Sequence, residues 1–351
     1  MSSSFEIFYT KNLPEFIHEN SFSILITTYQ AGKLIVIGSS NGEELYQTPV
    51  SLKKPMGIAL KDNKMAIACF DELRFFSSNE NIHEVINNSV EGNYDVGFAQ
   101  RATYFTGNLD IHDIEFGEGI LWGVNTMMSC IGIYDINFSF RPKWKPKFIS
   151  DIIPEDRCHL NGMAMENQLP KYVTALGKSD KKQGWRDDKM NGGLLMKVPE
   201  GDILLEGLSM PHSPRLIGGD LYFLESGRGT LNCYHPEEKK VEKVFDFQCF
   251  VRGMDVIGNV LVIGKSKIRS TNKDFNDLNI SKNSKSGGLI LFDLLEKAIV
   301  GEIDYKNTVE EIYDVKVLEN VKNPAILTDE FELNQEIITL PRNKYWKKKE
   351  D

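Results

Sequence analysis

Residues 208–234, LSMPHSPRLIGGDLYFLESGRGTLNCY, form the stretch that decides the fold. Its three short apolar segments are separated by glycine-containing turns at 218–220 and 227–229, a pattern typical of an antiparallel meander. His212 stands at the start of the first segment, and Glu225 stands at the end of the second. In an up-and-down meander these two places lie at the same end of the sheet. The stretch therefore predicts one sheet with a polar rim at one end.

The same unit recurs along the chain, with three or four apolar segments in most copies. The other copies begin near Pro55, Ile111, His159, Val251 and Glu310. When the first segments are aligned, one column contains residues that are 56, 49, 52, 39 and 61 positions apart, namely Gly57, Asp113, Gly162, Pro214, Gly253 and Asp314. A period of about fifty residues with three or four strands in each unit is typical of a propeller blade.

These repeats predict an all-β fold, a single six-bladed β-propeller over residues 1–342, followed by a basic tail at 343–351. The apolar segments at 22–30 and 33–38 have no first strand before them, and little strand pattern follows the last copy at 310–320. We therefore expect the N-terminal strands to complete the last blade, because such closure hides sheet edges. The alternative fold is a pair of β-sandwiches with irregular strands.

Three regions depart from the repeat. Residues 77–106 are less regular and are predicted to form a loop with one short strand. Polar insertions delay a strand in the third copy, at 181–193, and in the fifth copy, at 270–287. No segment has a helical period over four turns, which disfavours an α/β fold.

Composition excludes several classes of protein. The net charge is −9, whereas a nucleic-acid-binding surface requires a basic face. No apolar run approaches the roughly 20 residues of a membrane helix, and the N-terminus does not resemble a secretory signal. The five cysteines are scattered and contain no CxxC pair, so we expect reduced thiols in a cytoplasmic protein.

Polar residues gather at one mouth of the predicted central channel, where first strands begin and second strands end. Three of the six histidines fall there, namely His112, His159 and His212. Together with Asp113 and Glu225 they are the candidate catalytic residues. The candidate substrate-binding residues, at the mouth or in the insertion beside it, are Asn125, Asn161, Arg186, Arg252, Lys267, Glu311 and Tyr313.

Two chemical interpretations fit this set. The three histidines and Glu225 would hold a divalent metal (Zn, Ca or Fe), which would polarise a substrate or activate water. Without a metal, the histidines and carboxylates would transfer protons while Arg186 and Arg252 hold an anion. Both describe an enzyme that acts on a small polar or anionic substrate. The competing hypothesis is a non-catalytic propeller that binds a peptide, glycan or protein partner at the mouth.

Several motifs, in order along the chain, resemble a known family. They span roughly residues 15–340 and are TYQAGKL, CHLNGMAM, ALGKSD with GWR, LSMPHSPR, LESGRG and EEIYDV. They resemble an uncharacterised, largely bacterial family catalogued as a domain of unknown function. The resemblance implies a propeller-like fold and no established activity, and some relatives resemble fusions with tetratricopeptide repeats.

A second similarity is confined to residues 161–164, NGMA, and to Ser179-Asp180. These residues are similar to motifs of gluconolactonase-like six-bladed propellers, which are metal-dependent hydrolases. The similarity implies Asn161 and Asp180 as metal ligands. This chain differs from those proteins in having three mouth histidines and no clear matching N-terminal glutamate.

Overall fold

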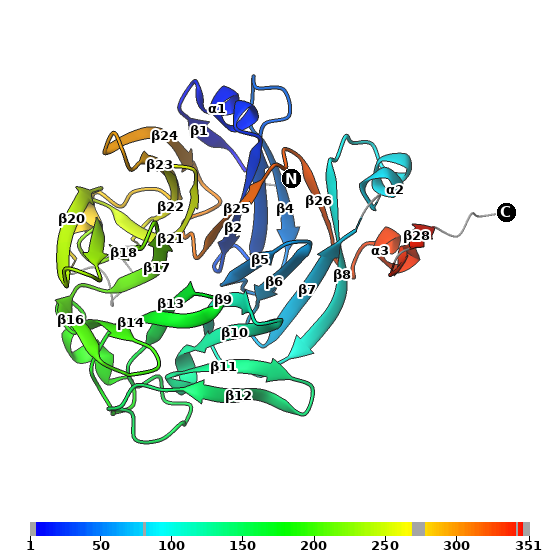
Figure 1. The fold of residues 1–351 in the computed structure, drawn as a ribbon. Helices are drawn as coiled ribbons and strands as arrows, with labels where there is room; N and C mark the ends of the chain where they lie inside the picture. The colour runs from blue at the N-terminus through cyan, green and yellow to red at the C-terminus, as the bar shows by residue number, and fades with distance from the viewer. Residues whose placement is uncertain (1–4, 80–81, 269–277, 342, 347–351) are drawn as a thin grey trace.

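The computed structural model describes residues 5–79, 82–268, 278–341 and 343–346. Six sheets are arranged around a central axis, and the predicted six-bladed β-propeller is confirmed (Figure 1). We number the blades by the order of their first strands. Blade 1 contains β5 (Ile58–Lys61), β6 (Lys64–Ala68), β7 (Glu72–Ser78) and β8 (Val96–Phe105).

The next three blades are four-stranded meanders. Blade 2 contains β9 (Ile111–Gly117), β10 (Ile120–Asn125), β11 (Cys130–Asp135) and β12 (Phe138–Trp144). Blade 3 contains β13 (Leu160–Glu166), β14 (Leu169–Ala175), β15 (Gly193–Lys197) and β16 (Ile203–Leu208). Blade 4, which begins with the stretch analysed first, contains β17 (Pro211–Ile217), β18 (Asp220–Glu225), β19 (Thr230–His235) and β20 (Lys240–Asp246).

The ring closes between the two ends of the chain. Blade 5 contains β21 (Phe250–Ile257), β22 (Val260–Ser266), β23 (Gly288–Asp293) and β24 (Ala298–Tyr305). Blade 6 combines β25 (Val315–Glu319) with β2 (Phe22–Thr28), β3 (Lys33–Gly38) and β4 (Tyr46–Ser51). Every residue of β2 is buried, and Ile24 lies opposite Val317 of β25. The predicted closure by the N-terminal strands is therefore confirmed.

The prediction of a loop at 77–106 is wrong. This region contains the end of β7, helix α2 (Ile82–Ser89) and all ten residues of β8. The outer side of β8 is covered by β26 (Pro324–Leu327), which pairs with it in parallel, and Ile82 and Ile86 pack against Ala99. The elements that cover β8, α2 and β26, come from two separate segments of the chain. The sequence of β8 therefore lacks the regular alternation of apolar and polar residues that identifies a strand with one buried face.

Further elements lie at the periphery. β1 (Ile7–Tyr9) pairs with β24, and helix α1 (Leu13–Glu19) buries Leu13 and Ile17 against blades 5 and 6. Helix α3 (Glu332–Glu336) precedes β27 (Ile338–Leu340), which pairs with β28 (Asn343–Trp346), and these elements project from the ring (Figure 1). The basic tail was predicted at 343–351: its first four residues form β28, and residues 347–351 lie outside the described part. In the described residues, no helix has the length and apolar character needed to cross a bilayer.

The apolar core lies between neighbouring blades. Ile24 and Ile26 of blade 6, for example, pack with Val262 and Leu291 of blade 5. Facing sheets thus bury their apolar faces against each other, and the first strands are left to line the central channel with polar groups. This division places the polar residues discussed next.

Candidate functional site

Side-chain hydrogen bonds from one blade to the first strand of the next organise the channel mouth. Thr126 Oγ1 donates to Leu160 O at 2.6 Å, and Ser226 Oγ donates to Val251 O at 2.6 Å. Equivalent bonds join Thr27 Oγ1 to Met56 O, Ser266 Oγ to Ile312 O, and Asn161 Nδ2 to Pro211 O. Each accepting carbonyl directly precedes the residue that its blade presents to the mouth.

We call these residues the mouth ring, one from each blade: Gly57, His112, Asn161, His212, Arg252 and Tyr313. The five with side chains line one small cavity, together with Asp113, Ser213, Arg215 and Asp314. Its volume of about 10 Å³ is close to the space that one water molecule needs. The column aligned from the sequence mixes positions, because Gly57 belongs with His112 rather than with Asp113. The register shifts by one residue in β9, β13, β17 and β21, whereas β5 pairs with β6 without a shift.

Two ring histidines have the same hydrogen bonds. His112 Nδ1 lies 3.0 Å from Asp110 O and 2.9 Å from Thr126 Oγ1. His212 Nδ1 lies 2.9 Å from both Met210 O and Ser226 Oγ. The single proton of each hydroxyl is donated to the next blade, so each Nδ1 is the donor. Nε2 of both rings therefore presents a lone pair, and it has no hydrogen-bond partner among the described residues.

Burial keeps these two imidazoles neutral. Desolvation is the main cause that lowers the pKa of His112 to about 4, and it also lowers the pKa of His212 well below its ordinary value. The nearby Arg252 guanidinium lowers both pKa values further. At neutral pH the two rings thus act as hydrogen-bond acceptors or metal ligands rather than as cations.

His159, which directly precedes β13, completes the predicted trio. Its ring lies 4.7 Å from that of His112, edge to face, so the structure brings the three histidines together at the mouth. Its Nδ1 lies 3.0 Å from Oδ1 of Asp156, while Oδ2 of Asp156 accepts the Trp185 indole N–H at 2.8 Å. A carboxylate at Nδ1 fixes the ring and leaves Nε2 as the basic nitrogen. His159 Nε2 also has no hydrogen-bond partner in the described residues.

A row of stacked rings continues from this pair in both directions. On one side His159 packs against Trp185, and the Arg186 guanidinium lies over the Trp185 ring, 4.2 Å from its centre. On the other side His112 packs against Tyr313, which stacks on Tyr29. Arg252 lies 4.0 Å from the Tyr313 ring centre and forms an ion pair of 2.7 Å with Glu311.

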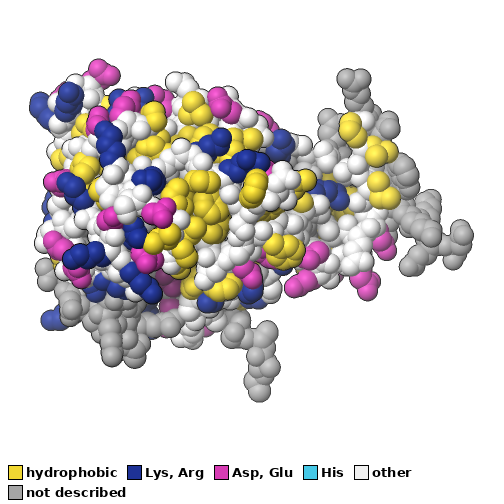
Figure 2. Space-filling model, turned by 90° about the horizontal axis from the view of Figure 1, so that it is seen from below, with side chains coloured by type: hydrophobic (Ala, Val, Ile, Leu, Met, Phe, Trp, Pro, Cys, Tyr) yellow, Lys and Arg dark blue, Asp and Glu magenta, His cyan; other side chains and the backbone are white. Residues whose placement is uncertain are grey.

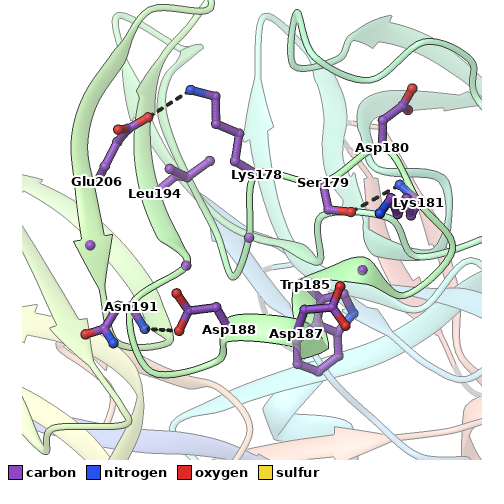
Figure 3. Close-up of a pocket in the computed structure, with 14 residues that line it drawn as sticks. Lys178, Ser179, Asp180, Lys181, Trp185, Asp187, Asp188, Asn191, Leu194 and Glu206 are labelled. Atoms are coloured by element: carbon purple, nitrogen blue, oxygen red, sulfur yellow. Dashed lines mark hydrogen bonds and ion pairs between the residues drawn. The ribbon is translucent and has the colours of Figure 1, made fainter.

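The first insertion builds a pocket beside this row. The insertion, predicted at 181–193, leaves blade 3 at the mouth. Most residues of 177–192 surround a cavity of about 740 Å³, together with Leu194, Glu206 and Gly207 (Figure 3). Lys178 bonds Glu206 at 3.0 Å across it, and Asp187 and Asp188 lie on its wall with Trp185. This volume lies in the usual range of small-molecule sites. Trp185 thus connects the pocket to His159.

The second insertion packs on the first. Ile268, Leu278 and Ile280 join Trp185 and Leu176 in one apolar cluster. This cluster also includes Met210 and Phe250 of blades 4 and 5, so it fixes the insertion loops over one side of the mouth. Residues 270–277 of the predicted insertion lie outside the described residues.

Arg215 closes the channel below the mouth ring. Its guanidinium bonds Asp113 Oδ2 at 3.2 Å and Met254 O at 3.0 Å, and it lies 3.6 Å from Asp314 Oδ1. Lower in the channel Lys316 pairs with Glu115. Burial raises the pKa of Asp314 to about 7, although Arg215 acts in the opposite direction.

Three predicted site residues, Glu225, Asn125 and Lys267, lie outside both the ring cavity and the row of stacked rings. Glu225 accepts hydrogen bonds from Ser209 N at 2.7 Å and from Asn232, and it pairs with Arg228. Asn125 is fully buried in blade 2 and accepts the Tyr134 hydroxyl hydrogen bond. Lys267 forms an exposed pair with Glu310.

The predicted metal-ligand set does not form a compact cluster. Within the part of the chain that the structure describes, the one group of three His, Cys, Asp or Glu ligand atoms mutually within 4.8 Å is Asp220, Cys233 and His235. The three mouth histidines and Glu225 do not meet that spacing. Two buried polar atoms of the ring cavity have no hydrogen-bond partner among the described residues, namely Asp113 Oδ1 and the Tyr313 hydroxyl.

Sequence reasoning missed several residues of the mouth. Asp156, Thr126, Ser226 and Arg215 were not candidates. Thr126 and Ser226 each follow the last residue of a second strand, so an alignment of the blades by second strands would have identified them. Asp156 carries no such signal, because it lies in the irregular segment between blades.

Comparisons with known proteins agree with the fold. A chain in the solved structure titled "Crystal structure of Nidogen/Laminin Complex" matches with a TM-score of 0.50 and 10% sequence identity, over 85% of this chain and 99% of that chain. This likeness concerns the fold alone. No curated protein matches the sequence. The family model described as "Domain of unknown function (DUF4915)" matches residues 11–327. The chain therefore belongs to the DUF4915 family.

Proposed function

We propose that this protein is an enzyme that acts on a small polar or anionic molecule at the channel mouth, with His159 as the group that accepts a proton. The observation that carries the proposal is the Asp156–His159 pair, because the His159 ring packs against Trp185 of the pocket wall, with 4.4 Å between the ring centres. A histidine oriented by a carboxylate is a common general base. Its proton would come from water or from a substrate hydroxyl group.

The surroundings suit a substrate with several polar groups. Asp187, Asp188 and Asn191 on the pocket wall offer hydrogen-bond acceptors and donors to hydroxyl groups. Lys181, on the same wall, offers a positive charge to a carboxylate or phosphate. The ring cavity below has room for about one water molecule, so the reacting group would sit above it.

A metal-assisted version of the same reaction uses the Nε2 lone pairs of His112, His159 and His212. Each Nδ1 is already held by a carbonyl, hydroxyl or carboxylate, which is the usual support of a metal-binding histidine. This version requires the three side chains to move closer together, since they do not form a group within 4.8 Å. The acid–base version requires no such movement, and it is the one we favour.

The similarity to gluconolactonase-like propellers makes lactones one substrate class to test. Their suggested ligands are engaged within this protein, since Asn161 bonds Pro211 O and Thr174, and Asp180 bonds Arg157 and Ser150 N. The proposal therefore assigns Asn161 and Asp180 no direct chemical role.

The test is an activity screen with matched variants. Lactones, phosphate esters and sugar acids are incubated with the wild type, His159→Gln, Asp156→Asn and, as a control, His83→Gln in α2. We expect turnover of one class by the wild type and the control, and a loss of about 10²–10⁴-fold in His159→Gln. Full turnover in His159→Gln would contradict the proposal.

The second candidate is a non-catalytic propeller, and a surface feature at the other end of the blades favours it. A groove of about 560 Å³ runs between blades 1 and 2, lined by Phe75, Phe116 and Tyr134 among others. Ile136 beside it is 93% exposed, and Phe138 is 57% exposed. Seen from the side of blade 2, hydrophobic side chains gather in the middle of the surface (Figure 2). Exposed apolar patches of this kind often bind partners. A wild type that converts none of the compounds of the screen would favour this candidate.

A further inference from the structure

Three potential metal-binding side chains lie together on one face of blade 4, at the opposite end of the blade from the mouth. Asp220 begins β18, while Cys233 and His235 lie two residues apart at the end of β19. Tyr222 of β18 lies opposite Cys233, so alternation along each strand places Asp220, Cys233 and His235 on the same face. The pairing of β18 with β19 thus brings together residues thirteen to fifteen positions apart.

The three ligand atoms lie close to one another. His235 Nδ1 is 2.9 Å from Asp220 Oδ1 and 4.0 Å from Cys233 Sγ, and all three atoms lie mutually within 4.8 Å. In a tetrahedral zinc site, metal–ligand bonds of about 2.0–2.3 Å place nitrogen and sulfur about 3.6 Å apart and nitrogen and oxygen about 3.3 Å apart. Each observed distance therefore differs from that geometry by about half an ångström, which small side-chain rotations provide.

Exposure and charge also suit a cation. Cys233 is 1% exposed and forms the floor of the cluster, whereas the side chains of Asp220 and His235 are 39% and 29% exposed. An ion therefore has a path from solvent and a position for a water ligand. Glu242 of β20 lies opposite Cys233 in the sheet and adds a second carboxylate nearby, which pairs at 3.9 Å with Lys297 from the neighbouring blade.

We propose that Asp220, Cys233 and His235 form a binding site for a zinc-class divalent transition metal on blade 4. The mixed sulfur, nitrogen and oxygen ligand set excludes calcium and magnesium as preferred occupants, because these ions take oxygen ligands. Thiolate and imidazole are ligands that zinc and cobalt share. The bound metal would cross-link β18 to β19. The site is separate from the mouth, and it does not depend on the proposed enzymatic function.

The experiment uses the full chain without a histidine tag and Co²⁺ as a spectroscopic probe at neutral pH. A cobalt–thiolate bond gives a charge-transfer band in the near ultraviolet, and tetrahedral cobalt gives intense visible bands. We expect one equivalent of Co²⁺ to produce both, and Zn²⁺ to displace it. Cys233→Ser should remove the charge-transfer band, while the control Cys249→Ser should keep it.

Two further variants keep the test decisive if Cys233→Ser fails to fold, because their side chains are partly exposed. His235→Gln and Asp220→Asn should each weaken Zn²⁺ binding by at least about tenfold, measured by competition with a chelating dye. Absence of the charge-transfer band in the wild type would overturn the proposal. So would Zn²⁺ affinity that is unchanged in both His235→Gln and Asp220→Asn.

Discussion

Asp156 and His159 are three residues apart, and both have a left-handed backbone, with φ of +48° and +50°. This turn places His159 Nδ1 3.0 Å from Asp156 Oδ1. A left-handed conformation costs of order 1–3 kcal/mol for a residue with a β-carbon. The surrounding structure maintains it through backbone bonds from Asp156 N to Met127 O and from Leu176 N to His159 O. The fold thus maintains an energetically unfavourable backbone conformation that orients the His159 imidazole at the mouth.

Asp156→Asn should loosen this arrangement. The amide can accept only with its oxygen, so either His159 Nδ1 or the buried Trp185 N–H loses its acceptor. We expect a loss of about 1–3 kcal/mol in the free energy of unfolding and a change in tryptophan emission. Urea unfolding followed by fluorescence measures both. The exposed Asp151→Asn serves as a control, and equal stability of the two variants would contradict the prediction.

Thr126→Val tests the hydrogen bonds that fix His112. The change keeps the shape of the side chain and removes the bonds to Leu160 O and to His112 Nδ1. In the wild type we expect nitrogen NMR to find the proton of neutral His112 on Nδ1. The variant should lose about 1–2 kcal/mol of stability, while the proton should stay on Nδ1 because Asp110 O still accepts it. A wild-type ring protonated on Nε2 would show that the assignment is wrong.

Glu225→Ala and Arg252→Ala should behave differently. Glu225 bonds a buried backbone N–H and Asn232, so its removal should lower stability by about 1–3 kcal/mol. Arg252 lies at the mouth beside Tyr313, and its removal should leave the protein folded and reduce thermal stabilisation by phosphates, sugar acids or carboxylates. Thermal shift across such a panel measures both effects. Unchanged responses of Arg252→Ala to every stabilising compound would exclude it from the ligand site.

Asp314 should make stability depend on pH. Burial raises its folded pKa to about 7, despite the opposing effect of Arg215, and the ordinary value is 3.8. Between these values the folded chain holds a proton that the unfolded chain has lost, so stability falls as pH rises from about 4 to about 7. Neighbouring Asp113 adds to the shift and Lys316 opposes it, while the raised pKa of Glu115 contributes in the same direction.

Asp314→Asn should therefore reduce the loss of unfolding free energy between pH 4 and pH 7 by at least about 1 kcal/mol. Urea unfolding at several pH values measures this loss. The control is Asp255→Asn, which removes an equivalent carboxylate that bonds Val317 N. An equal slope in the wild type and in Asp314→Asn would contradict the assignment.

Deletion of residues 1–38 should abolish cooperative unfolding. It removes β2 and β3, which are the middle strands of blade 6, and leaves β25 and β4 unpaired. A deletion of residues 1–10 is the matched control, because it removes only β1 from the outer edge of blade 5. Calorimetry should show one sharp transition for the control and none for the longer deletion. A similar transition in both would contradict closure as the source of stability.

The sequence by itself determined the architecture. Turn residues such as Gly218 and Gly219 and the alternation within short strands are local signals, and they recur about every fifty residues. The repeat has six first strands, and the strands at 22–38 have no first strand before them. The N-terminal strands therefore had to complete the last blade and close the ring. The same positions identified His112, His159 and His212 as a set, since equivalent places in different blades meet at one mouth.

Only the tertiary structure decided what these residues contact. Asp156 faces His159 and Trp185 because the first insertion folds back over the mouth, which no local pattern encodes. Glu225 was a candidate ligand, yet it bonds inside the protein because β18 ends beside Ser209. The choice of partner depends on contacts between blades that are distant in sequence. For the same reason the sequence did not identify Arg215 as a channel residue, although it bonds Asp113 of another blade. It also did not identify β8 as a full-length strand, since β8 pairs with β26 from a distant part of the chain.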